Sequence, residues 1–358
     1  MCEQIISHHL NPVFLLSMDK NISFFSLGIL VGVLAATFVF TYTAGDRSGS
    51  DEAAKVLKLA HGLDTGHPVH LGMVRMQERV AELSGGRLKL DIYPSGVLGS
   101  EVQCIEQLQS GELAMTKTST AAMESFIPEL GIFGVPYLFD NEDHYWNVIN
   151  GDVGRELLAI GEASGLFGLC YYDAGSRNFY STDKPIRSPA DLQGMKIRVQ
   201  NSRMAIAMVE ALGGSPTPIA WGELYSALAQ GVVDGAENNM PSFESNRHYE
   251  ECKYFTPDAH TRVPDLLMIS TAVWQSLDAQ EQAWLQEAAD ISSTYQRELW
   301  AVKTEESLAK VIEAGVEIVD CDPSAFQQAC EPIKATLAGT PVAPWLQKIQ
   351  ETKHGIGR

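Results

Sequence analysis

The hydrophobic pattern near the start of the chain predicts strands and helices in alternation. Residues 56–61 read as a first strand, and residues 88–92 alternate apolar with charged side chains, as a half-buried strand does. Between them, apolar residues from Val69 to Leu83 recur at spacings of three and four, the period of an amphipathic helix. Pro68 suits the first turn of this helix, and the glycines at 85 and 86 end it.

The alternation continues through the next part of the chain. We expect a helix over residues 101–108, a strand over 113–118 and a helix over 144–160. Strands that alternate with helices favour an α/β fold with mostly parallel sheets covered on both faces. The chain has 358 residues, more than a single hydrophobic core usually organises, so two lobes are expected.

One long segment in the C-terminal third predicts a single helix. Residues 278–314 contain no Gly or Pro, and their apolar positions recur at helical spacing: Trp284, Ala288, Ile291, Tyr295, Leu299 and Val302. One helix of this length would span about 50 Å at 1.5 Å per residue, enough to cross two lobes. Two helices joined by a kink near Lys303 and Thr304 are the alternative.

The N-terminal segment predicts export. Residues 21–45 carry no charge, and residues 24–40 are apolar apart from Ser26 and Thr37. At 17 residues, the length of this run lies between that of a long signal-peptide core and that of a short transmembrane helix. A cleaved signal peptide and an uncleaved anchor both remain open, and either sends the rest of the chain across a membrane.

Charge and cysteine content exclude several classes of function. The formal net charge of −19 argues against nucleic-acid binding, which needs clustered Lys and Arg. The six cysteines show no zinc spacing, and we expect no metal and no cofactor. Cys104 and Cys170 are interpreted as buried thiols, whereas a disulfide between Cys321 and Cys330 stays open.

Polar residues follow three short apolar runs in the middle of the chain. Arg177 comes after an apolar run at 170–172, Arg198 lies within the K-I-R-V block, and the E-N-N sequence at 237–239 follows two valines. An α/β scaffold presents such residues to a ligand in a crevice outside the ends of its strands.

These blocks resemble a known family. The order G-S-R, then G-M-K-I-R-V, then P-T-P-I-A-W-G-E-L-Y-S-A-L and V-D-G-A-E-N is similar to DctP-type solute-binding proteins of tripartite ATP-independent periplasmic (TRAP) transporters, over about residues 58–337. The resemblance implies a two-lobed periplasmic binding protein, type II-like, with a hinge and a long lobe-spanning helix. Such a receptor captures an organic acid between its lobes and hands it to membrane permease subunits.

The resemblance also implies domain boundaries. We expect a signal or anchor segment with its linker at residues 1–50 and a tail at 341–358. Lobe I would comprise residues 51–174 plus 264–303, and lobe II residues 175–263 plus 304–340. Contact with the membrane would then be made only through the N-terminal segment.

The resemblance implies roles for three residues in these sequence blocks. Arg198 matches the arginine that holds the ligand carboxylate, and its planar fork suits a bidentate pair. Arg177 matches a second arginine that contacts the carboxylate or a hydroxyl. Asn238 matches the site asparagine and is followed by Asn239.

Two further positions have both a binding and an ordinary structural interpretation. Trp221 matches a position where the family places an aromatic ring against the ligand, although a tryptophan in the core would fit the sequence equally well. Glu101 matches an acidic position that accepts hydroxyl hydrogen bonds, and a carboxylate at the start of a helix is also favourable to the helix dipole.

The remaining candidates shape the expected ligand. Ser119 stands where the sialic-acid branch of the family has a glutamate, and Lys117 adds a cation nearby. His61 and His67 flank the first strand–helix turn, and Tyr180 follows the first arginine. This mixture suits a polyhydroxylated monocarboxylate, and the chain looks most similar to receptors for hexuronates such as D-glucuronate or D-galacturonate. C4-dicarboxylates are the alternative ligand.

The sequence also bears on two other classes of function, an enzyme and a membrane-anchored sensor. No G-x-S-x-G, H-E-x-x-H, P-loop or G-x-G-x-x-G pattern is present, so we expect no enzyme. His67 and His70 are one helical turn apart but lack a nearby third metal ligand. A membrane-anchored sensor with the same fold remains an alternative to a transport receptor.

Overall fold

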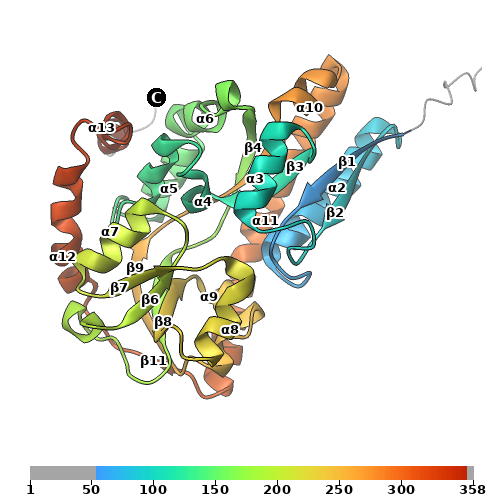
Figure 1. The fold of residues 1–358 in the computed structure, drawn as a ribbon. Coiled ribbons are helices and arrows are strands. Elements are labelled where there is room, and N and C mark those ends of the chain that lie inside the picture. Colours follow the sequence, from blue (N-terminus) through green and yellow to red (C-terminus); the bar gives the residue numbers. More distant parts are fainter. Residues whose placement is uncertain (1–53, 353–358) are drawn as a thin grey trace, which may run out of the picture. The chain divides into compact units, whose positions relative to one another are not determined.

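The computed structural model describes residues 54–352, which form two sheets with helices around them (Figure 1). The predicted apolar segment at 24–40 lies outside the described residues, as does Cys2. The first sheet has the order β2-β1-β3-β10-β4. Its strands are β1 (Lys55–Ala60), β2 (Leu88–Tyr93), β3 (Met115–Ser119), β4 (Leu166–Tyr172) and β10 (Asp265–Ser270).

The second sheet has six strands in the order β11-β9-β5-β8-β6-β7. They are β5 (Arg177–Ser181), β6 (Lys196–Val199), β7 (Ser215–Pro218), β8 (Gly235–Asn238), β9 (Tyr254–Thr261) and β11 (Glu317–Ile318). We call the part of the molecule around the five-stranded sheet lobe I and the part around the six-stranded sheet lobe II. The boundaries expected from the sequence stay a prediction.

The two-lobed α/β fold is confirmed, and both sheets are mixed. The chain crosses from lobe I to lobe II between β4 and β5 and returns between β9 and β10. Strand β10 runs antiparallel to β3 and β4, and β5 runs antiparallel to β8 and β9. The other pairs, among them β1 with β2 and β6 with β8, are parallel.

Helices cover these sheets. Those of lobe I and the C-terminal region are α2 (Pro68–Ser84), α3 (Glu101–Ser110), α4 (Thr120–Met123), α5 (Glu142–Ile149), α6 (Asp152–Ala159), α10 (Thr271–Ser276), α11 (Ala279–Glu313), α12 (Pro323–Thr336) and α13 (Ala343–Thr352). Lobe II adds α7 (Arg203–Ala211), α8 (Leu224–Ala229) and α9 (Met240–Ser245). Short 3-10 turns are η1 (Pro128–Gly134), η2 (Glu162–Ser164), η3 (Pro189–Leu192), η4 (Trp221–Glu223) and η5 (His248–Glu250).

Helix α2 forms as its sequence predicts. Pro68 occupies the first turn, where its missing N–H costs no hydrogen bond, and the His67 side chain caps the helix by accepting from the Val69 amide. The apolar stripe is buried except for Leu83, which is half-buried. Gly85 ends the helix in the left-handed conformation, with φ of 60°.

The single helix expected over residues 144–160 is wrong. The structure has α5 and α6 there, separated at Asn150 and Gly151. Gly151 has an extended backbone, with φ of −86° and ψ of −167°, which interrupts the helix. A Cβ added there would lie 2.6 Å from the carbonyl oxygen of Asn147, so a larger residue would not fit.

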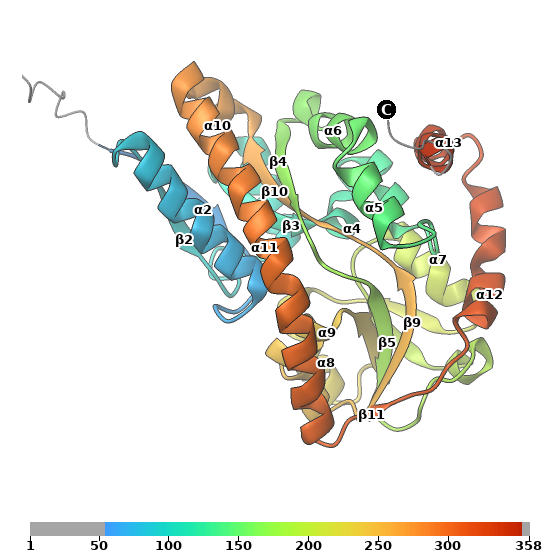
Figure 2. The ribbon, with the colours of Figure 1, turned by 180° about the vertical axis from the view of Figure 1, so that it is seen from behind.

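Helix α11 is continuous over 35 residues, so the kinked alternative is wrong. Asp278 caps it and forms a capping box with Glu281. Figure 2 shows α11 passing along both lobes, and it packs against α2 and β4 in lobe I and against α9 in lobe II.

The buried face of α11 differs from the predicted one. Tyr295 and Val302 are exposed, at 40% and 52% of their surface. The polar residue Gln296 is fully buried instead, because its amide bonds both backbone groups of Asp173, at 2.8 Å and 2.9 Å. Hydrophobic spacing alone does not reveal a polar residue that is buried for its hydrogen bonds.

Within residues 54–352 all five cysteines are free thiols, so Cys321 and Cys330 are not paired in the structure. In the same part of the chain, no helix combines the length and the apolar character needed to cross a membrane.

Candidate ligand-binding site

A cavity with about 460 Å³ of empty space, part of it open solvent, lies between the lobes. It brings together seven of the predicted site residues: Glu101, Lys117, Ser119, Arg177, Trp221, Asn238 and Asn239. A second, outer cavity shares Glu101 and Trp221 with the first and is lined by Arg198. The ends of β3, β5, β6 and β8 therefore meet at one place, as the sequence predicts.

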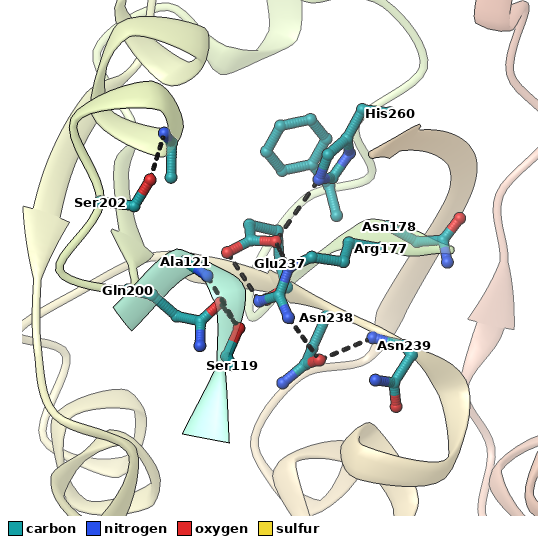
Figure 3. A network of polar contacts seen from close by, with 12 residues as sticks. Ser119, Ala121, Arg177, Asn178, Gln200, Ser202, Glu237, Asn238, Asn239 and His260 are labelled. Carbon is teal, nitrogen blue, oxygen red and sulfur yellow. Dashed lines mark hydrogen bonds and ion pairs between the residues drawn. The ribbon is translucent and has the colours of Figure 1, made fainter. Parts of the chain in front are cut away.

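Arg177 begins β5 and is held by the neighbouring strand β8 (Figure 3). Its guanidinium forms a two-pronged ion pair with Glu237, in which Nη2 donates to Oε1 at 2.8 Å and Nε donates to Oε2. Nη2 also donates to the Glu237 carbonyl at 2.7 Å, and Nη1 donates to Oδ1 of Asn238 at 3.0 Å. Burial acts to lower the pKa of Arg177, but the Glu237 carboxylate outweighs burial and raises it.

Glu237 in turn belongs to a buried chain of charges. His260 lies 2.8 Å from Asp258 through Nδ1 and 3.4 Å from Glu237 through Nε2. Burial alone would lower the pKa of His260, yet the two carboxylates raise it to about 9, so this histidine is a cation at neutral pH. Burial would raise the pKa of Glu237, but Arg177 and His260 lower it to about 2. The charges of the two cations, Arg177 and His260, therefore balance those of the carboxylates of Glu237 and Asp258. This network holds the Arg177 guanidinium in one orientation.

A second charged group lies on lobe I. Lys117 Nζ is 3.0 Å from Asp265 Oδ1 and 3.6 Å from Glu101 Oε1. Asp265 is paired with Ser119 in the register of β3 and β10, so Lys117 is its diagonal neighbour across the strands. Burial raises the pKa of Asp265 to about 6, although Lys117 opposes the shift. One cation faces two carboxylates here.

Arg198 differs from both of these cations. It is only 2% exposed, its Nε donates to the Ile219 carbonyl at 2.9 Å, and its Nη1 has no hydrogen-bond partner. No carboxylate among the described residues forms an ion pair with it. Burial lowers the pKa of Arg198, but a guanidinium remains protonated in proteins. It is thus a buried cation without an ion-pair partner among the described residues.

Trp221 carries a second unpartnered donor next to Arg198. The indole Nε1 is buried without a hydrogen-bond partner, and the guanidinium carbon lies 5.8 Å from the centre of the ring. A buried donor without a partner costs free energy, which an acceptor on a ligand would relieve. The sequence suggested a stacking ring at this position, and the structure adds a free N–H.

Three of the predicted site residues do not line either cavity. His61 is buried and bonds His70 at 3.0 Å, and burial lowers its pKa to about 3. Tyr180 lies in the core of lobe II with its hydroxyl 2.9 Å from His248. His67 stands behind the cavity, with Nε2 3.2 Å from the Ser242 hydroxyl.

Sequence reasoning missed three polar residues that line the inner cavity: Gln200, Ser242 and Asp265. Signals for two of them were present, since Gln200 directly follows β6 and Asp265 opens the apolar run of β10. Among the described residues, no group of three or more His, Cys, Asp and Glu side chains is arranged to hold a metal ion.

Comparison with known proteins identifies the family to which the chain is similar. The model of the DctP family, bacterial extracellular solute-binding protein family 7, matches residues 59–339. The chain is 37% identical over 302 residues to the uncharacterized protein YiiZ of Salmonella typhimurium, covering 84% of this chain and 92% of the relative.

Two solved TRAP periplasmic solute-binding proteins superpose closely. One, from a Bradyrhizobium species in complex with D-galacturonate, has a TM-score of 0.81 and 37% identity, covering 83% of this chain and 100% of its own. The other, from Roseobacter denitrificans with β-D-glucuronate bound, has a TM-score of 0.79 and 34% identity, covering 83% and 99%. The chain therefore belongs to the DctP family of TRAP-transporter solute-binding proteins, which are periplasmic receptors.

Proposed function

We propose that this receptor binds a hexuronate, such as D-galacturonate or D-glucuronate, between its lobes and delivers it to TRAP permease subunits. The observation that carries the proposal is Arg198, a buried cation with no anionic partner and a free Nη1. A ligand carboxylate would accept from Arg198 and from Trp221 Nε1. Hydrogen bonds to charged groups contribute roughly 1.5–3 kcal/mol each.

The charged residues that line the inner cavity favour ligand hydroxyl groups over a second carboxylate. Glu101 and Asp265 share the single cation Lys117, and the charge of Arg177 is balanced by Glu237. A second ligand carboxylate would face this excess of negative charge, whereas sugar hydroxyls would donate to it. The charge distribution therefore supports a polyhydroxylated monocarboxylate and disfavours a C4-dicarboxylate.

We assign direct ligand contact to residues on both lobes. They are Arg198, Trp221, Asn238, Asn239, Glu101, Lys117, Ser119 and Arg177, the last through the Nη1 hydrogen that Asn238 leaves free. The uronates bound by the Bradyrhizobium and Roseobacter proteins support this choice of ligand class.

Titration calorimetry on residues 51–358 tests the proposal. D-Galacturonate, D-glucuronate, D-galactose and succinate are compared at the same protein concentration. We expect heat of binding from one or both uronates and none from the neutral sugar or the dicarboxylate. Equal affinity for D-galactose would contradict a carboxylate anchor, and binding of succinate alone would favour the dicarboxylate.

We also propose that the apolar residues 24–40 direct export of the chain, as a cleaved signal or as an anchor. Fractionation of the producing cells, with mass spectrometry of the N-terminus, distinguishes the two. A periplasmic protein that begins after residue 40 indicates cleavage, and a membrane-bound protein that retains residues 24–40 indicates an anchor. A protein confined to the cytoplasm would contradict export.

A further inference from the structure

The Ser242 hydroxyl lies at the wall of the inner cavity with one polar partner. Ser242 is on α9 of lobe II, is 4% exposed, and donates its backbone N–H to Asn239 Oδ1 at 2.8 Å. Among the described residues, its Oγ bonds only His67 Nε2, at 3.2 Å. His67 belongs to lobe I, so this contact joins the two lobes across the edge of the cavity.

The direction of this hydrogen bond follows from the other ring nitrogen of His67. Nδ1 accepts the Val69 amide at 3.2 Å as the cap of α2, so it carries no proton. Burial first, and the nearby Lys117, His61 and His70 next, keep the pKa of His67 well below its usual value, and the ring is neutral. A neutral ring with a bare Nδ1 carries its proton on Nε2.

His67 therefore donates to Ser242, and the hydroxyl accepts. A serine hydroxyl that accepts one bond keeps its own hydrogen free for another acceptor. No described protein group takes that hydrogen, and Ser242 is one of the residues that line the cavity. The centre of the Trp300 ring lies 5.8 Å from the centre of the His67 ring, and the two rings are tilted by 59°.

We propose that Ser242 donates a hydrogen bond to an oxygen of the bound sugar acid, and that His67 is the positioning residue for this hydroxyl. The inference rests on the proposed function and extends it. Because the two residues belong to different lobes, opening the cleft separates them. The hydroxyl is then oriented toward the ligand only while the lobes are together.

Two substitutions at position 67 test the roles of the two ring nitrogens of His67 one at a time. In His67→Asn, the amide oxygen takes the place of Nδ1 and keeps the helix cap, but nothing replaces Nε2. In His67→Gln, the amide nitrogen reaches the place of Nε2, but the cap is lost. Ser242→Ala removes the hydroxyl itself.

The experiment is calorimetry with D-galacturonate and D-glucuronate, together with thermal unfolding of each ligand-free variant. We expect Ser242→Ala and His67→Asn each to weaken uronate binding about tenfold, the equivalent of one lost hydrogen bond. His67→Gln should lower the melting temperature but keep more of the affinity than His67→Asn. The double variant His67→Asn/Ser242→Ala should bind no more weakly than Ser242→Ala, since His67 acts through Ser242.

The outcomes separate this inference from the proposed function. Failure of the parent protein to bind either uronate would contradict both. Binding by the parent with unchanged affinity in Ser242→Ala would contradict the inference alone. Losses that multiply in the double variant would show that His67 acts independently of Ser242, and a lower melting temperature of His67→Asn without a loss of affinity would make its role purely structural.

Discussion

At the scale of single residues, the three buried cations of the site differ in their partners. Arg177 and Lys117 each have a carboxylate within the protein, whereas Arg198 has none. A buried charge without a partner destabilises the ligand-free protein, and a ligand carboxylate offsets that cost. If Arg198 holds the ligand carboxylate as proposed, ligand binding and the stability of the ligand-free protein place opposite demands on it.

Replacement of Arg198 tests this opposition. Arg198→Lys keeps the charge but loses the planar fork, so uronate affinity should fall by about tenfold or more. Arg198→Met should abolish binding and leave the ligand-free protein as stable as the parent or more stable, by up to roughly 3 kcal/mol, because it removes an unpaired donor. Urea unfolding without ligand measures the second effect.

Arg177→Met is the matched control. It leaves Glu237 buried without its partner, so it should destabilise the ligand-free protein by roughly 3–5 kcal/mol. Similar losses of stability from Arg177→Met and Arg198→Met would show that Arg198 also has a structural ion-pair role.

The imidazolium of His260 predicts a dependence of stability on pH. Its pKa is about 9 in the folded protein and 6.5 as the ordinary value, because Asp258 and Glu237 outweigh burial. The folded state thus holds the proton more tightly, and the stabilisation is complete below pH 6.5 and is lost as pH rises toward 9. Urea unfolding between pH 6 and 9.5 should show falling stability, and His260→Gln should flatten the curve over this interval. An unchanged slope in the variant would assign the loss to other groups.

The sequence identifies site residues that stand in recognisable motifs, but it does not reveal contacts between residues that are far apart along the chain. Arg198 and Asn238 stand in blocks whose order resembles a family, Glu101 matches an acidic position of that family, and the structure brings all three to the cavities. The contact between Glu237 and His260 joins residues 23 positions apart across two strands, and no spacing in the sequence marks it. Their charge balance could be recognised only from the structure.

At the scale of elements, the sequence predicts helices by their caps and breakers more reliably than by their buried faces. Pro68 and Gly85 bound α2 as predicted, and the absence of Gly and Pro predicts the length of α11. The buried face of α11 was missed because Gln296 faces inward to bond Asp173. A polar side chain in that position interrupts the hydrophobic period on which the prediction depends.

The contact between α2 and α11 gives a prediction at this scale. A Cβ at Gly72 would lie 2.8 Å from the Cβ of Gln296, closer than two such atoms can approach. Gly72→Ala should therefore push the helices apart and destabilise the protein by roughly 1–3 kcal/mol, as overpacked substitutions do. At Gly222 an added methyl group meets nothing within 4 Å, so Gly222→Ala is the control. Equal melting temperatures for the two variants would contradict close packing at Gly72.

At the scale of the whole receptor, residues of both lobes line one cavity. The two lobes also contact each other directly. Ser202 of lobe II donates to Glu124 Oε2 of lobe I at 2.6 Å, and the Met204 amide approaches the same oxygen at 3.4 Å. Glu124 lines neither the inner nor the outer cavity, so it bears on the closed arrangement and not on ligand contact.

Lobe closure is the prediction that tests this arrangement. If the lobes close around a hinge, D-galacturonate should reduce the radius of gyration of the parent protein in solution scattering. Glu124→Ala should enlarge the ligand-free form and weaken apparent affinity, because a smaller fraction of molecules is competent to hold ligand. At saturating ligand the variant should reach the same radius as the parent, since every contact with the ligand remains. Scattering curves of the parent that superimpose with and without ligand would contradict hinge closure, and a preformed cavity would then have to admit the ligand without movement of the lobes.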